Sequence, residues 1–364
     1  MKKNNLLFYI CLSLLITISL LGMHNLPLIN PFYQNYFLKQ IIWFSIGIIL
    51  FILSKNIPLK YYQKYSLIIY IINIILLILV LIIGNPINGS KAWLQFKFFS
   101  IEPSEFMKIS LILVLGSIKN KQGFKYLFKI FIYTLLPIIL VFLEPDTGQI
   151  IIYLLIFLTF LYCSKLKVIT KLLITILGLS IITTLIWLYL NNPDFIINIF
   201  GTSLFYRIDR LINFKNNYQL ENALIVIGSS SKYILKLNHI SLYIPESPTD
   251  FFFAFLIGSF GYYLGILIII LYFIIIISII NKRNMISIPL LIIFSFQVIY
   301  NISMNLGIVP IMGIPLPFLS YGGTNIISYL ILFGLLFNKD DNIDNHKNYK
   351  SHCYKALDKV VDKA

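Results

Sequence analysis

The sequence predicts an all-α polytopic membrane protein with ten transmembrane helices and one large outward loop before the eighth. Of its 364 residues, 59% are hydrophobic and only 12% are charged, whereas an average soluble domain carries about 25% charged residues. Apolar stretches close to the ~20 residues that a helix needs to cross a bilayer recur along the chain. We therefore interpret residues 1–337 as one membrane domain.

The predicted spans are apolar runs separated by turns that contain polar residues, lysine or proline. The first run follows Lys2 and Lys3 but lacks a small-residue cleavage site, so we interpret it as a retained span and not as a signal peptide. The runs between residues 104 and 164 are shorter, and polar turns divide them into three. In chain order the predicted spans are residues 6–23, 38–54, 65–83, 104–118, 130–144, 148–164, 168–190, 251–280, 286–305 and 321–337.

Lysine placement predicts the topology. Alternate connections between the spans are rich in basic residues, and the positive-inside rule assigns these connections to the cytoplasm. Both termini then lie inside, and the polar residues 338–364 form a cytoplasmic tail that we expect to be disordered. The net charge of +15 follows this topology, so it does not indicate nucleic acid binding. The basic residues of this set are Lys2, Lys3, Lys55, Lys60, Lys64, Lys119, Lys121, Lys125, Lys129, Lys165, Lys167, Lys171, Lys282 and Arg283.

Acidic residues give an independent check on the topology. All those that precede the tail fall in outward connections or at the outer ends of predicted spans. Solvation of the outer face explains part of this set. Glu105, Asp146 and Asp250, however, lie at or inside span ends, where ionisable groups often mark a functional cavity. The chemistry of this protein is therefore predicted to face outward.

The stretch "IPESPTDFFFAF", residues 244–255, places Asp250 directly before the eighth predicted span. Thr249 or Asp250 could serve simply as the cap of that helix. Alternatively, partial desolvation at the lipid–water boundary would raise the pKa of the Asp250 carboxyl group and suit it to general-base catalysis. The residues alone leave both interpretations open.

The outward loop of residues 191–250 is too long for a simple link between helices, so we expect it to be partly ordered and functional. Arg207 and Arg210 lie within it, although lysine supplies nearly all of the 29 basic residues. The planar arginine fork binds phosphate in a bidentate manner that lysine cannot copy. This pair therefore predicts pyrophosphate binding, with an internal ion pair to Asp209 as the alternative.

Further motifs supply candidate substrate-binding residues. Glu105 and Lys108 are spaced i, i+3 and can pair, either structurally or as the lining of a polar cavity. Trp93 suits an interfacial anchor or a platform that stacks on a sugar, and Asp146, in "LEPDTGQIII", is expected to cap the next helix. Ser320 belongs to "GIPLPFLSYGGTN", whose composition allows non-helical backbone beside a cavity. The three cysteines have no metal-ligand spacing, and we predict no metal site.

Taken in order, the motifs of this chain resemble those of the SEDS family (shape, elongation, division and sporulation), the bacterial peptidoglycan glycosyltransferases. The matching motifs are "KAWLQF…EPSEFMK", "EPDTGQ", "YRIDRLINF", "YQLENALIVIGSS", "IPESPTDFFFA" and "GIPLPFLSYGGT". The resemblance covers nearly all of residues 1–337. The sequence of the last motif and the short tails resemble those of the elongation branch of the family and not those of its division branch.

The resemblance implies a protein that polymerises lipid II into β-1,4 glycan strands at the outer, periplasmic face of the cytoplasmic membrane during cell elongation. It implies that Asp250 is the catalytic residue, and that Trp93, Glu105, Lys108 and Asp146 match functional positions of the family. The implied partners are lipid II, the lipid-linked glycan chain, membrane lipids and a class B penicillin-binding protein, which is a transpeptidase. No dedicated cofactor is implied, although a Mg²⁺ or Mn²⁺ ion could accompany the substrate pyrophosphate.

The chain also departs from the family pattern. The usual histidine of the Asp250 motif is Pro248 here, and the acidic pair that usually follows in the eighth span is Gly258-Ser259. These departures leave a non-catalytic scaffold for the penicillin-binding protein open as an alternative. A flippase for lipid-linked precursors is a second alternative, but the acidic residues cluster on one side and not at the midplane, where transporters usually bind their substrates.

Overall fold

The structure, a computed structural model, describes residues 2–28, 30–85, 90–97, 99–119, 121–214, 217–230, 244–282 and 284–338. Most of these residues are helical, and the short strands β1 (Leu94–Gln95) and β2 (Ser100–Ile101) pair antiparallel. The helices are α1 (Lys2–Asn25), η1 (Leu26–Leu28), η2 (Pro31–Tyr33), α2 (Tyr36–Asn56), α3 (Leu59–Lys64), α4 (Ser66–Ile83), α5 (Pro103–Gly116), α6 (Gly123–Leu143), α7 (Thr147–Tyr162), α8 (Val168–Asn191), α9 (Pro193–Ile212), α10 (Tyr218–Ser229), α11 (Phe252–Phe260), α12 (Tyr262–Ile280), α13 (Ser287–Asn305) and α14 (Gly323–Leu336).

The predicted fold class, a helical membrane protein with several spans, is confirmed. In the described ranges, seven helices are long and apolar enough to cross a membrane, and α7 and α14 are shorter apolar helices. Each predicted span coincides with a helix, except that the single helix expected over residues 251–280 is wrong. Gly261, whose φ is +87°, divides it into α11 and α12. That backbone conformation is one that glycine alone adopts readily. The number of spans, ten, stays a prediction.

Helix α5 lies in the centre of the bundle. Except for Phe106, its residues are buried from one end to the other, and it packs against α4, α6, α7 and α14. A helix that is buried all round has no outward face on which charge could be solvated, so polar side chains on it must find partners inside the protein. This position sets the environment of Glu105 and Lys108.

Helix α14 packs closely along α2 through two glycines. A Cβ atom at Gly323 would lie 2.1 Å from the ring of Trp43, and one at Gly334 would lie 1.9 Å from Oγ of Ser54. Small residues allow helices in a membrane to approach in this way. This contact holds α14 beside α5, so that the first turn of α14 lies near the polar residues at the start of α5.

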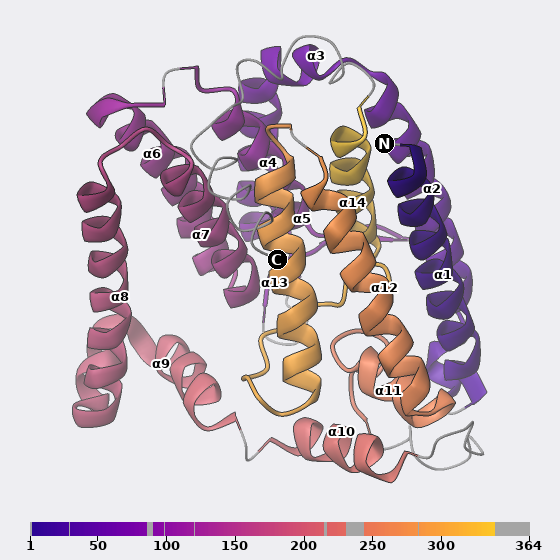
Figure 1. The fold of residues 1–364 in the computed structure, drawn as a ribbon. Helices are drawn as coiled ribbons and strands as arrows, with labels where there is room; N and C mark the ends of the chain where they lie inside the picture. The colour runs from indigo at the N-terminus through magenta and orange to yellow at the C-terminus, as the bar shows by residue number, and fades with distance from the viewer. Residues whose placement is uncertain are drawn as a thin grey trace.

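Helices α3 and α10 mark opposite ends of the bundle, and α8 with α9 lies at its edge (Figure 1). The predicted outward loop, residues 191–250, contains α9 and α10. Helix α10 packs on α11 and α13 through an apolar cluster that includes Leu220, Ala223, Phe251 and Met304. Residues 231–243 of this loop, and the predicted tail from residue 339 onward, lie outside the described residues.

Candidate active site

Asp250 lies in the turn that leads into α11, and it is half-buried. Its backbone carbonyl accepts hydrogen bonds from Nδ2 of Asn301, at 3.1 Å, and from Nδ2 of Asn305, at 3.0 Å. These amides are one helical turn apart on α13, so they face the same side of that helix. The position of Asp250 is therefore set by α13 as well as by its own turn.

The prediction that Thr249 or Asp250 caps this helix is wrong. The N-cap position of α11 is Phe251, and Oγ1 of Thr249 donates to Oε2 of Glu246 at 2.9 Å. Instead, Oδ1 of Asn305 accepts from the backbone N–H of Ala254, at 3.0 Å. A side chain from another helix thus satisfies one of the N–H groups that a helix leaves without an intrahelical partner, and the general-base role of Asp250 stays a prediction.

The segment between α13 and α14 lies against the Asp250 turn. The N–H of Tyr321 donates to the carbonyl of Pro248 at 2.7 Å, and Nδ2 of Asn301 also donates to the carbonyl of Ile314 at 2.8 Å. Gly313 has a positive φ of +66°, and a Cβ atom there would lie 3.9 Å from Oδ2 of Asp250. The non-helical backbone predicted for this motif is confirmed, and it lies beside the carboxylate.

Ser320, a predicted substrate-binding residue, lies in the same segment and is buried. Its Oγ accepts from the N–H of Leu316 at 3.0 Å, and its carbonyl accepts from Nε2 of Gln40 at 3.3 Å. In this structure Ser320 therefore stabilises its own turn and joins that turn to α2.

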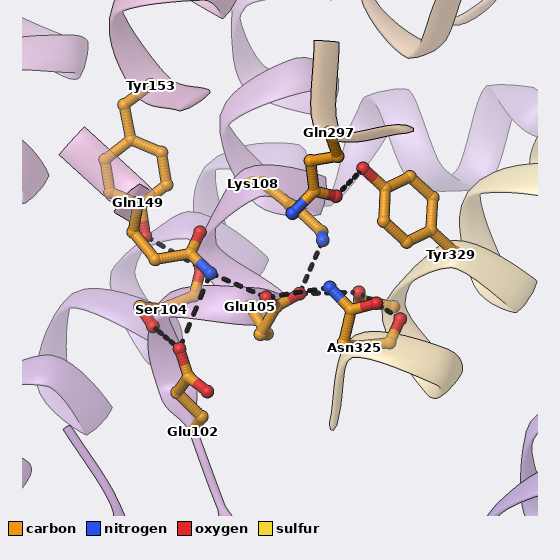
Figure 2. Close-up of polar contacts among 10 residues, drawn as sticks. Glu102, Ser104, Glu105, Lys108, Gln149, Tyr153, Gln297, Asn325 and Tyr329 are labelled. Carbon is orange, nitrogen blue, oxygen red and sulfur yellow. Dashed lines mark hydrogen bonds and ion pairs between the residues drawn. The ribbon is translucent and has the colours of Figure 1, made fainter. Parts of the chain in front are cut away.

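A buried polar network surrounds Glu105 in the middle of the bundle (Figure 2). The Lys108 ammonium donates to Oε2 of Glu105 at 2.5 Å, with both side chains almost completely buried. Oε1 of Glu105 accepts from Nε2 of Gln149 at 2.6 Å and from Nδ2 of Asn325 at 3.0 Å, and Oε2 also accepts from Oγ of Ser328 at 3.0 Å. The network thus joins α5, α7 and α14, and the predicted Glu105–Lys108 pair is confirmed.

The other side of Lys108 faces an aromatic ring. Its ammonium lies 4.0 Å from the ring centroid of Tyr329, a geometry in which a cation is attracted to the face of the ring. The hydroxyl of Tyr329 hydrogen-bonds with Oε1 of Gln297 on α13, and Nε2 of Gln297 has no hydrogen-bond partner among the described residues. The charge of Lys108 is therefore enclosed by protein on both sides.

Carboxylates gather beside this network, where α5 and α7 begin and α6 ends. Asp146 caps α7 as predicted, since its Oδ1 accepts from the N–H of Gln149 at 3.1 Å. Glu102 precedes α5, and its Oε1 accepts from Oγ of Ser104 at 2.9 Å. Glu144 ends α6 and is fully buried, and neither of its carboxylate oxygens has a hydrogen-bond partner within the described ranges.

This environment favours the protonated forms of the carboxylates. Burial, followed by the nearby charge of Asp146, raises the pKa of Glu144 to about 8. Burial is also the main reason that the pKa of Asp146 is raised to about 6. Burial and the neighbouring charges of Glu105 and Asp146 raise the pKa of Glu102 well above its ordinary value. Desolvation disfavours the charged form of an acid, so this cluster can store a proton as well as negative charge.

Asp146 and Asp250 lie on either side of one backbone segment. A Cβ atom at Gly148 would lie 3.1 Å from the carbonyl oxygen of Met312 and 3.5 Å from Oδ1 of Asp146, and Gly313 adjoins Asp250. The structure therefore brings together Asp250, Asp146, Glu105 and Lys108, which are far apart in the sequence.

Trp93 is half-buried and lies just before β1. The N–H of Lys91, two residues earlier, donates to the backbone carbonyl of Glu144 at 3.2 Å. Trp93 is thereby placed on a segment that adjoins the carboxylate cluster.

The backbones of Arg207 and Arg210 belong to α9, but their side chains lie outside the described residues. Asp209, between them, accepts from the hydroxyl of Tyr189 at 2.6 Å and from Nδ2 of Asn213 at 2.8 Å. The predicted pyrophosphate role of the two arginines stays a prediction.

Sequence reasoning missed the amides and one acid of this site. Gln149, Asn301, Asn305 and Asn325 hold the carboxylates or their backbone, and Glu144 joins their cluster. A usable signal was present for Asn301 and Asn305, because two amides spaced i, i+4 in an apolar span indicate one polar stripe facing the protein interior.

The model of the FtsW/RodA/SpoVE family of cell cycle proteins matches residues 3–346. The chain belongs to this family. Among its members, the probable peptidoglycan glycosyltransferase FtsW of Buchnera aphidicola subsp. Baizongia pistaciae is 31% identical over 362 residues, which cover 91% of each chain. The peptidoglycan glycosyltransferase MrdB of Helicobacter pylori is 28% identical and covers 83% of this chain and 82% of its own.

Solved structures of the family have the same fold. A chain from a structure described as showing structural coordination of polymerization and crosslinking by a peptidoglycan synthase complex aligns with a TM-score of 0.72. It is 22% identical and covers 90% of this chain and 95% of its own. The rod shape determining protein RodA of Thermus thermophilus aligns with a TM-score of 0.64 at 18% identity, over 94% and 96% of the two chains.

Proposed function

We propose that this protein is a peptidoglycan glycosyltransferase that polymerises lipid II into β-1,4 glycan strands, with Asp250 as the general base. The observation that carries the proposal is the half-buried carboxylate of Asp250, at the head of an apolar helix and anchored through its backbone by Asn301 and Asn305. Relatives across the family are named peptidoglycan glycosyltransferases.

The reaction joins a sugar hydroxyl to an anomeric carbon. A sugar hydroxyl is a poor nucleophile at neutral pH, and a positioned carboxylate that takes its proton speeds attack by about 10²–10⁴-fold. Asp250 takes the proton from the 4-hydroxyl of the acceptor, lipid II. The oxygen bonds to the anomeric carbon of the lipid-linked glycan chain as the bond to pyrophosphate breaks, which inverts the α-linked donor to a β-1,4 product.

The pyrophosphate that leaves this reaction carries accumulating negative charge. Arg207 and Arg210, in α9, are our candidates to bind it, because a planar fork with several donors stabilises charge that develops on phosphate oxygens. Lys108 is enclosed by Glu105 and Tyr329, so we propose that it positions the Glu105 network. Trp93 and Asp146 are proposed to line the sugar-binding region.

No group of three histidine, cysteine, aspartate or glutamate side chains in the described part of the chain could hold a metal ion. We therefore assign no residue to a metal. A Mg²⁺ or Mn²⁺ ion bound with the substrate pyrophosphate would supply charge neutralisation at the leaving group.

The membrane context extends the proposal. We propose that both termini are cytoplasmic and that Asp250 faces the periplasm, because lysine-rich connections alternate along the sequence with connections that hold the acidic residues. The proposed partner is a class B penicillin-binding protein that cross-links the strands. Assignment to cell elongation rests on the sequence of the "GIPLPFLSYGGT" motif. Overall identity does not separate the branches, since relatives named FtsW and MrdB are 31% and 28% identical.

Polymerisation of purified lipid II by the protein with its partner, before and after the change Asp250→Asn, tests the proposal. We expect the variant to lose polymer formation while it still unfolds at the wild-type temperature. Asp194→Asn is the matched control, because Asp194 is another carboxylate of the predicted outward loop, is exposed in the first turn of α9 and belongs to no proposed site. Unchanged polymerisation by Asp250→Asn would remove Asp250 from the mechanism.

The same variant separates the alternatives. A flippase is indicated if the wild type does not polymerise lipid II and if Asp250→Asn still moves lipid II across the membrane of vesicles. Restoration of cell shape by Asp250→Asn indicates a scaffold that acts only through its partner.

A further inference from the structure

A cavity of about 530 Å³ lies between the first half of α6, the end of α5 and the start of α4. Helix α5 begins at the Glu105 network and ends at this cavity, so the two sites are separated by the length of that helix. Leu67, Tyr126 and Tyr133 contribute apolar walls, and Lys119, Lys125 and Lys129 line the cavity. It takes no part in the proposed glycosyl transfer.

The residues that line the cavity suit it to bind an anionic group. Its three lysines are exposed, and none of its lining residues is acidic. Lys125 and Lys129 are spaced i, i+4 on α6, so both ammonium groups reach the same side of that helix. In addition, Gln122, the N-cap residue of α6, lines the cavity and makes no side-chain cap hydrogen bond. The first N–H groups of a helix and its dipole favour an anion at this end.

The walls of the cavity continue into apolar surface. Leu67, Ile71 and Ile75 recur along one exposed face of α4, and Phe128, Phe131 and Leu135 are exposed on α6. The hydroxyl of Tyr70 donates to the carbonyl of Tyr133 at 2.9 Å and ties the two helices together. A ligand with an anionic head at the lysines and long apolar tails along α4 and α6 complements both parts.

We propose that this cavity binds the phosphate headgroup of an anionic phospholipid whose acyl chains lie against α4 and α6. Basic pockets between membrane helices on the cytoplasmic side are suited to such headgroups, and the proposed topology places this cavity in the inner leaflet. A soluble phosphate would use the lysines but leave the apolar walls without a function. The site does not include Asp250, so a result that contradicts lipid binding here can be distinguished from one that contradicts the proposed enzyme activity.

The test is retention of phosphatidylglycerol by the purified full chain, measured by native mass spectrometry in detergent with phosphatidylcholine as the reference lipid. The variant is Lys125→Gln with Lys129→Gln. The matched control is Lys60→Gln with Lys165→Gln, which removes the same charge from exposed lysines that do not line the cavity. We expect the first variant to bind phosphatidylglycerol about tenfold more weakly or worse, since it loses two charged contacts, and the control to bind it as the wild type does.

Three outcomes would overturn the proposal. Equal weakening in both double variants means that general surface charge attracts the lipid. Equal retention of phosphatidylcholine and phosphatidylglycerol by the wild type means that the headgroup is not recognised. Displacement of the lipid by millimolar glycerol phosphate, which has no acyl chains, means that the site takes a soluble phosphate. Thermal unfolding of both variants at the wild-type temperature excludes misfolding as the cause.

Discussion

The Asn301 side chain donates to the backbone carbonyl of Asp250 at 3.1 Å and, from the same nitrogen, to the carbonyl of Ile314 at 2.8 Å. Through this one nitrogen, Asn301 links α13 to the turn before α11 and to the segment before α14. Asn301 is fully buried, so water cannot replace it. The position of the proposed base depends on an amide 51 residues further along the chain.

We expect Asn301→Ala to lower both stability and polymerisation. The change leaves buried carbonyl oxygens with fewer donors, which costs about 1–3 kcal/mol, and it frees the Asp250 turn to move. Asn338→Ala is the matched control. That asparagine is also buried, and its Nδ2 donates to the carbonyls of Ser54 and Ile57, far along the chain from Asp250. Thermal unfolding in detergent should show a loss for both variants, and the lipid II assay a loss for Asn301→Ala alone. A similar loss of polymerisation in both would mean that only general stability matters.

The positions of the helices were predictable, but the break at Gly261 was not. Long apolar runs bounded by lysines or turns identify membrane helices because no other structure satisfies the backbone in lipid. A single glycine within such a run, however, is common in membrane helices. Its positive φ depends on how α11 and α12 pack against α10, α13 and α1, which no local pattern contains.

The candidate site was predictable only where its contacts are local. The i, i+3 spacing of Glu105 and Lys108 predicts their ion pair, and the structure has it. The donors Gln149 and Asn325 reach Glu105 across separations of 44 and 220 residues. Such pairings follow from tertiary packing, so sequence spacing could not supply them. The capping role of Asn305 escaped prediction for the same reason.

We expect Lys108→Met to be strongly destabilising and the double change Glu105→Gln with Lys108→Met to recover much of the loss. Removing one partner of a buried ion pair leaves an uncompensated charge and costs about 3–5 kcal/mol, whereas removing both charges does not. Glu105→Gln keeps a side chain that can accept from Gln149 and Asn325. A double-mutant cycle of unfolding free energies measures the coupling. If the double variant is less stable than Lys108→Met, charge compensation is not what holds this pair in the bundle.

We expect the stability of the protein to fall as the pH rises from about 5 to about 8, in part because of Glu144. The folded state holds the Glu144 proton up to a pKa of about 8, while the unfolded chain releases it near 4.5. The folded state therefore binds more protons within this window, so the free energy of unfolding decreases as pH increases. Above the folded pKa both states are ionised, and the dependence ends.

Glu144→Gln tests this pH dependence. The variant should unfold at a higher temperature than the wild type at pH 8, and its unfolding temperature should change less between pH 5 and pH 8. Asp209→Asn is the control, since hydrogen bonds from Tyr189 and Asn213 lower the pKa of Asp209 and place its titration below this window. Identical pH profiles for the wild type and Glu144→Gln would show that the Glu144 carboxyl group is not protonated at neutral pH.

We expect Gly261→Ala to reduce polymerisation by displacing α11 and, with it, the Asp250 turn. A side chain at φ +87° and ψ 164° is strained by about 1–3 kcal/mol, and the chain can relieve this strain by joining α11 and α12 into one continuous helix. Gly178→Ala is the matched control, because Gly178 lies within α8 with no atom within 4 Å of an added Cβ and alanine is the better helix former. Thermal unfolding and the lipid II assay should both show losses for Gly261→Ala and none for Gly178→Ala. Wild-type polymerisation by Gly261→Ala would mean that the base is positioned by α13 alone and that the break between α11 and α12 is dispensable.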